Sequence, residues 1–65
     1  MFMSQYRVTI FAQDGITVIA VYTCLHSAPT IVDAHFAGEK LIERFNAHRP
    51  IGTHFFVLVS DVDAD

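Results

Sequence analysis

The chain has one cysteine, Cys24, which excludes a disulfide bond within the monomer. Small secreted domains are usually held together by several disulfides, so a single cysteine favours a reducing compartment. A chain of 65 residues buries a smaller share of its surface than a larger domain, and its single core gives only marginal stability. A metal ion, an oligomeric partner or an unusually apolar core must therefore supply further stability.

Positive charge is equally scarce in this sequence. The only fixed cations are Arg7, Lys40, Arg44 and Arg49, and seven acidic residues bring the formal net charge to −3. Proteins that bind the phosphate backbone of nucleic acids cluster Lys and Arg on one surface. The charge balance therefore argues against nucleic acid as a partner.

Long apolar runs are also missing. No run approaches the length of a membrane-spanning helix, and the start of the chain lacks the basic and apolar regions of a signal peptide. Hydrophobic residues nevertheless make up 52% of the chain, which is a high share for this length. We therefore expect a soluble, cytoplasmic protein with no membrane partner and with more apolar surface than its own core can cover.

What the sequence does contain is a strong hairpin signal over residues 6–23. Asp14 and Gly15 separate two β-prone runs, and this dipeptide favours a two-residue type I′ turn. With these two residues as the loop, Val8 pairs with Val21, and residues that pair directly share a face of the sheet. A register slip of one residue would exchange the two faces.

The predicted register gives the hairpin two unequal faces. One has a continuous aliphatic centre and should meet the core. It comprises Tyr6, Val8, Ile10, Ala12, Thr17, Ile19, Val21 and Thr23. The opposite face comprises Arg7, Thr9, Phe11, Gln13, Ile16, Val18, Ala20 and Tyr22. Neither face is fully polar, so both should find a partner.

A helix is predicted over about residues 30–48, after a connection that starts at Cys24. The helix N-cap is either Ser27 or Thr30, and Thr30 with Asp33 three residues later fits a capping box. Gly38 lies near the centre of the apolar stripe, so we expect the helix to approach the sheet closely there. The stripe consists of Ile31, Ala34, Gly38, Leu41, Ile42 and Phe45.

The last element is a strand over residues 54–62, which is apolar on both faces and is followed by an acidic tail at residues 63–65. Pro50 and Gly52 end the helix and turn the chain before it. We predict a single α+β domain over residues 1–65 with the element order ββαβ and one helix on one face of an antiparallel sheet. The strand order is 2-1-3, because the third strand then runs antiparallel to the first.

The histidines and the cysteine give no recognisable site. The helix separates His26 from His48 and His54 by about 1.5 Å per residue over roughly seventeen residues, which argues against a shared metal ion. His48 and His54 flank one loop and could form half of a site between subunits, but no carboxylate or thiolate lies obviously beside them. Cys24 and His26 can lie on one face of an extended segment, which is the minimum for a thiolate–imidazole pair, but no oxyanion element accompanies them. We predict no catalytic residue, no cofactor and no metal.

The most informative feature is the apolar face that the helix leaves open. A patch of several hundred Å² at this position would mark an interaction site. The predicted interface residues are Phe11, Ile16, Val18, Tyr22, Phe56 and Leu58. On the third strand, Phe55, Val57 and Val59 remain the alternative set. The N-terminal segment could also fold across this face, or the register could differ.

These features predict a small non-enzymatic protein-interaction module that forms a homodimer through the open sheet face or across an edge strand. In length and element order the chain resembles small phage-encoded proteins that bind and inhibit host machinery. That resemblance, which is one of topology and includes no motif, implies an accessory inhibitor or adaptor that acts on a larger macromolecular machine.

Two other functions remain open at this point. One is a small-molecule binding protein or enzyme with a site at a dimer interface, lined by aromatic residues and by Cys24, His26 or His35. The other is a β-ribbon nucleic-acid binder, which would need basic residues on one face and is disfavoured by the charge balance.

Overall fold

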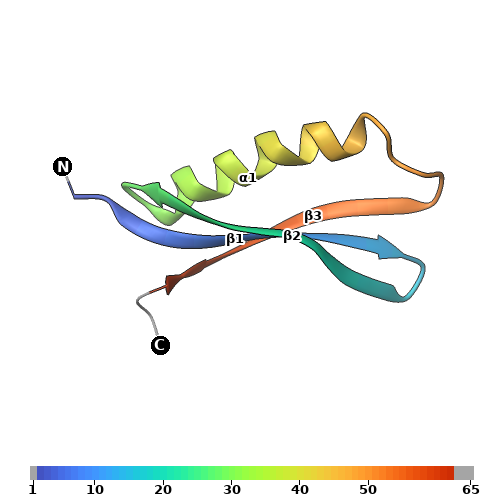
Figure 1. Ribbon diagram of the computed structural model, residues 1–65, viewed down its shortest axis with the longest axis horizontal. Helices are drawn as coiled ribbons and strands as arrows, with labels where there is room; N and C mark the ends of the chain where they lie inside the picture. Colours follow the sequence, from blue (N-terminus) through green and yellow to red (C-terminus); the bar gives the residue numbers. More distant parts are fainter. Residues whose placement is uncertain (1, 63–65) are drawn as a thin grey trace.

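The computed structural model describes residues 2–62. Strand β1 (Ser4–Asp14) and strand β2 (Thr17–Ala28) form a hairpin, helix α1 (Ile31–Asn46) follows, and strand β3 (Thr53–Asp61) completes the sheet (Figure 1). The acidic tail predicted at residues 63–65 lies outside the described residues.

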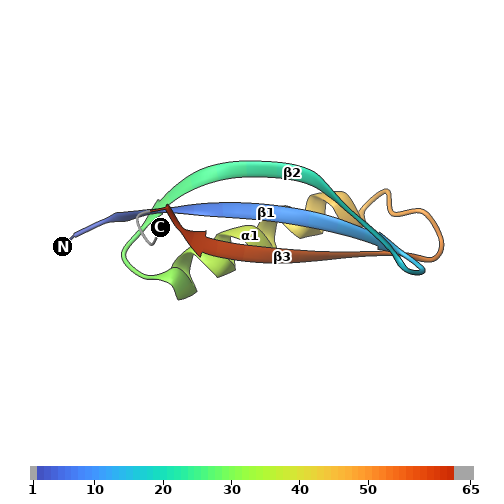
Figure 2. The same ribbon diagram turned by 90° about the horizontal axis from the view of Figure 1, so that it is seen from below.

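The sheet has the predicted strand order. β1 lies between β2 and β3 and pairs antiparallel with both, and α1 lies behind one face of the sheet (Figure 2). The two layers form an elongated molecule of 42 × 24 × 14 Å. The prediction of a small α+β domain with a 2-1-3 sheet and one packed helix is therefore confirmed.

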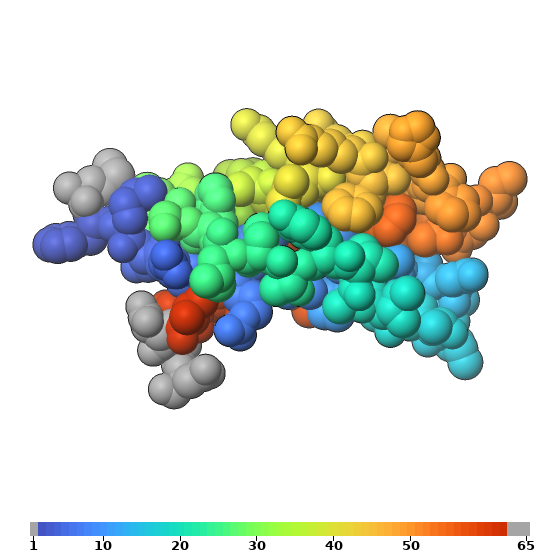
Figure 3. Space-filling model, in the orientation of Figure 1, coloured from blue at the N-terminus to red at the C-terminus, as the bar shows by residue number. Residues whose placement is uncertain are grey.

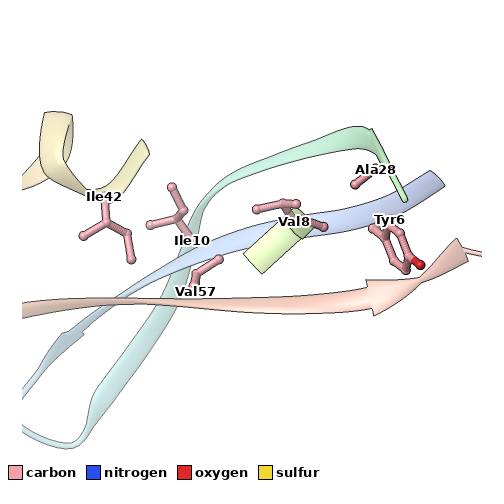
Figure 4. Close-up of a cluster of buried hydrophobic side chains, with 7 residues drawn as sticks. Tyr6, Val8, Ile10, Ala28, Ile42 and Val57 are labelled. Carbon is pink, nitrogen blue, oxygen red and sulfur yellow. The ribbon is translucent and has the colours of Figure 1, made fainter. Parts of the chain in front are cut away.

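The core follows the central strand. Tyr6, Val8 and Ile10 alternate with residues of the opposite face, and Val8 and Ile10 are almost fully buried. Figure 4 shows Val8 and Ile10 gathered along β1 with Val57 of β3, while Ile42 reaches toward them from α1. Because β1 has a strand on each side and the helix above it, its inward side chains lose contact with solvent on every side.

Gly38 lets the helix approach this core closely. A Cβ atom at Gly38 would lie 2.6 Å from Cγ2 of Val57 and 3.0 Å from Cγ1 of Val8. Carbon atoms in ordinary contact are about 3.5 to 4.0 Å apart, so a side chain at this position would force α1 or the side chain of Val57 to shift. The prediction of close approach at Gly38 is confirmed.

The helix begins at the capping residue that the capping-box pattern favoured. Thr30 has extended backbone angles, and its Oγ1 accepts a hydrogen bond from the backbone N–H of Asp33 at 3.3 Å. The same hydroxyl donates to Oδ2 of Asp33 at 2.8 Å. Thr30 is therefore the N-cap, whereas Ser27 belongs to β2.

The predicted hairpin register is wrong. Asp14 pairs with Thr17, so the loop consists of Gly15 and Ile16 rather than Asp14 and Gly15. Gly15 has φ of 63°, and no residue other than glycine among residues 2–62 has positive φ. A type I′ turn needs positive φ at both loop residues, whereas a type II′ turn needs it only at the first, where Gly15 stands. The turn chemistry therefore shifts the loop by one residue.

A β-bulge changes the register again further along the hairpin. Phe11 pairs with Ala20 while its neighbour Ile10 pairs with Tyr22, so Val21 is an extra residue in β2. Beyond this bulge the faces of β2 are exchanged relative to the prediction. Tyr22 therefore lies on the helix side of the sheet.

β2 is also longer than predicted. It continues to Ala28, so the segment that starts at Cys24 is strand and not connection. The reason is that β1 begins at Ser4, which pairs with Ala28, and thereby supplies partners for the end of β2. Ala28 is buried by this pairing.

Candidate functional site

The open face of the sheet is centred on two aromatic side chains. Phe11 of β1 and Phe56 of β3 pair directly, and their rings stack with centroids 5.3 Å apart and an interplanar angle of 17°. His54 lies two residues before Phe56 on the same face, and its ring centroid is 6.3 Å from that of Phe56. Phe11 and Phe56 are only partly buried, so the stack forms part of the surface.

Exposed aliphatic side chains lie on the same face as this aromatic pair. Val18 and Leu25 of β2 pair with Gln13 and Arg7, which alternate with the buried residues of β1 and therefore mark the open face. Leu58 of β3 lies on the same face and is 58% exposed. A shallow hollow of about 340 Å³ lies beside Leu58 and is lined by Thr9, Phe11, Leu58, Val59 and Ser60.

The polar groups on this face are mostly uncharged. Thr23 donates a hydrogen bond to Oγ1 of Thr9 at 3.3 Å, which joins β2 and β1 across the face. Among the residues of the three strands that lie on the open face, Arg7 is the only one with a fixed charge. The face therefore mixes apolar side chains with uncharged polar ones and carries a single fixed positive charge, although the chain as a whole has a net charge of −3.

The structure places most of the predicted interface residues on this face. Phe11 and Val18 lie there on the hairpin, and on β3 the choice of Phe56 and Leu58 is confirmed, since Val57 faces the core instead. Their role in binding stays a prediction. The N-terminal segment does not cover the face, because Phe2 is 95% exposed.

Two predicted interface residues lie elsewhere. Ile16 is in the hairpin loop at one end of the molecule and is almost fully exposed. Tyr22 lies on the helix side, where its ring centroid is 6.2 Å from that of Phe45. Sequence reasoning also missed Leu25, which is exposed on the open face, because it assigned this residue to a connection.

A second apolar region lies between α1 and β2. α1 packs chiefly on β3 and less on β1 and β2, so much of the helix side of β2 is uncovered. Figure 3 shows β2 exposed along the front of the molecule, below α1. A shallow groove of about 280 Å³ follows this boundary and is lined by Tyr22, Leu41, Arg44 and Phe45.

Cys24, His26 and His35 lie on the helix side of the sheet or on the helix itself. Cys24 and His26 share a face of β2, as expected, but Cys24 is a free thiol that packs against the core. Nε2 of His35 is 3.1 Å from Oε1 of Glu39 on the exposed surface of α1. Among residues 2–62, no group of three or more His, Cys, Asp or Glu side chains is placed to hold a metal ion.

The comparisons with known proteins add no assignment. No protein-family model, no curated protein and no solved structure matches this chain. Within the described part of the chain, no helix is both long and apolar enough to cross a membrane. The surfaces of the molecule are therefore the basis for its functional assignment.

Proposed function

We propose that this protein is a self-associating, non-enzymatic interaction module that docks on a larger macromolecular partner through the open sheet face. The observation that supports this proposal is the partly exposed stack of Phe11 and Phe56, with exposed Val18 and Leu58 in the neighbouring cross-strand rows. Soluble monomers rarely expose contiguous apolar patches of more than a few hundred Å² unless the patch binds a partner. The role is that of an accessory inhibitor or adaptor in the cytoplasm, where Cys24 remains a free thiol.

The chemistry of the face defines the partner. Full burial of side chains such as Phe56 and Leu58 contributes about 2 kcal/mol each, so an apolar counter-surface is required. Arg7 lies on the same face and is exposed, so a carboxylate on the partner would complement it. Face-to-face packing of two copies would instead enclose two Arg7 side chains with no acidic residue of this face beside them. The open face is therefore better suited to a different protein than to a second copy.

The test compares two substitutions of exposed aliphatic residues. Leu58→Asp places a carboxylate in the open face, whereas Ile51→Asp places one in the fully exposed turn before β3. The immobilised chain is incubated with an extract of the native host, and a protein that it retains is purified and titrated against each variant. We expect Leu58→Asp to weaken binding at least tenfold and Ile51→Asp to leave it unchanged. Equal affinities for the two variants would refute docking through this face.

A second candidate function is the binding of a small apolar acid in the groove of Tyr22, Leu41, Arg44 and Phe45. The observation in its favour is that Arg44 lines this groove beside two aromatic side chains, since Arg binds carboxylates through paired hydrogen bonds. Cys24, His26 and His35, which the sequence suggested for such a site, do not line this groove. Titration with a medium-chain fatty acid, followed by the NMR signals of Phe45, tests this function, and unshifted signals would exclude it.

A further inference from the structure

β2 is the part of the sheet that is least protected from pairing with another chain. It is an edge strand of 12 residues with β1 on one side only, so its outer edge presents unpaired backbone N–H and C=O groups. Of these residues only Ala28 is buried. Its exposed large apolar side chains are Val18, Ile19, Val21, Tyr22 and Leu25.

β2 also lacks most of the features that keep edge strands apart. Natural proteins protect such edges with Lys or other charges, with Pro, with short strands, with bulges or with a covering helix. Thr17–Ala28 contains no Lys, Arg, Asp, Glu or Pro, and α1 packs chiefly on the opposite edge strand. The bulge at Val21 is the one such feature, and it leaves regular pairing with β1 on both of its sides.

We infer that β2 pairs antiparallel with β2 of a second copy, so that one continuous sheet runs through a two-fold symmetric dimer. This inference rests on the proposed function, since it gives the form of the self-association. A two-fold axis perpendicular to the sheet brings the same strand edge of both copies together in antiparallel orientation. Charge supports a second copy as the occupant, because a strand without fixed charges meets itself without repulsion even though each chain has a net charge of −3.

The edge of β2 supplies part of the surface that a stable dimer needs. Twelve residues at about 3.3 Å each give an edge about 40 Å long, and a sheet layer about 10 Å thick gives on the order of 400 Å² per copy. A standard interface buries about 800 Å² per partner, so the strand edge alone is too small. The groove lined by Tyr22, Leu41, Arg44 and Phe45 lies beside the same edge and adds further surface, including one positive charge.

This arrangement leaves the open face free for the other partner. Because the axis is perpendicular to the sheet, the helices of both copies lie on one side and the two open faces lie side by side on the other. The dimer then presents two stacks of Phe11 and Phe56 in one continuous surface. Self-association and docking therefore use different parts of the same sheet.

Hydrogen exchange of the wild-type chain tests the inference directly. In a monomer the outward amides of β2 and of β3 are both unpaired and exchange rapidly. We expect the outward amides of β2 to become at least tenfold slower as concentration rises and dimer forms, while those of β3 do not change. A chain that stays monomeric by light scattering at the concentrations used for NMR would overturn the inference. So would a dimer in which the outward amides of β2 remain fast.

Matched lysine variants separate this inference from docking through the open face. Val21→Lys and Ile19→Lys each place a charge at an exposed position of β2, whereas Ile51→Lys places one in an exposed turn. We expect the first two to be folded monomers by circular dichroism and light scattering, and the Ile51 variant and Leu58→Asp to remain dimers. Dimers of both β2 variants with a monomeric Leu58→Asp would refute edge pairing and leave the open face as the site of association.

Discussion

β2 and β3 are both edge strands that pair antiparallel with β1, yet α1 covers β3 and leaves β2 largely open. On β3, Val57 is buried, and Phe55 and Val59 pack against the core. On β2 the strand is as apolar, but almost every residue is exposed. The difference arises from the path of the chain, because the helix that leaves β2 must cross β1 to deliver the chain to the far edge. The apolar content of a strand therefore does not determine whether the strand is buried.

The close contact of Gly38 with β1 and β3 holds α1 over that side of the sheet. A side chain introduced at Gly38 should therefore cause the largest loss of stability. Gly38→Leu would place a side chain where Val57 and Val8 already lie, at the point where a Cβ alone is 2.6 Å from Val57. We expect a loss of about 4 kcal/mol in the free energy of unfolding, measured by urea denaturation. Lys40→Leu, on the exposed side of the same helix, should change it by about 0.5 kcal/mol or less. Equal stability of the two variants would show that α1 does not rest on the sheet at Gly38.

Substitution of one valine in each edge strand tests how well each strand is covered. Val57 of β3 is 7% exposed and Val18 of β2 is 47% exposed. Truncation of a buried Val removes apolar contacts and leaves a cavity, so Val57→Ala should cost about 2 kcal/mol, whereas Val18→Ala should cost about 0.5 kcal/mol. Urea denaturation at a concentration where the chain is monomeric gives both values. A loss at Val18 as large as that at Val57 would mean that β2 is covered within the monomer.

The helix and its contact with the sheet are the part of the fold that the sequence predicts best. The helical stripe, the cap at Thr30 and the close approach at Gly38 depend on local patterns, and those patterns are sufficient for the topology. Phe11 and Val18 were placed on the correct face because both lie on the turn side of the bulge. Strict alternation in β3 places Phe56 and Leu58 on one face and Phe55, Val57 and Val59 on the other, and the structure decides which face is open.

The faces of β2 beyond the bulge and the full length of the strand could not be predicted, because two errors accumulate along β2. Gly15, with its positive φ, can be the second loop residue of a type I′ turn or the first loop residue of a type II′ turn. The choice between these turns depends on pairing further along the hairpin. The bulge at Val21 then exchanges the faces, so Tyr22 lies over the helix side. Pro29 marks the true end of β2, and Ala28 is strand only because Ser4 is present to pair with it. No local pattern in β2 encodes that partner.

The smallest expected effect concerns the point where the chain leaves β2 for the helix. Thr30→Ala removes the hydroxyl that accepts from the Asp33 backbone N–H and donates to its carboxylate, which should cost about 1 kcal/mol. Ser27→Ala changes the other candidate cap, which is an exposed residue of β2, and should cost about 0.5 kcal/mol or less. Urea denaturation of both variants beside the wild type gives the difference. If Ser27→Ala proved the more destabilising of the two, the helix would begin earlier and β2 would end before Ala28, and the open edge invoked in the proposed self-association would be shorter.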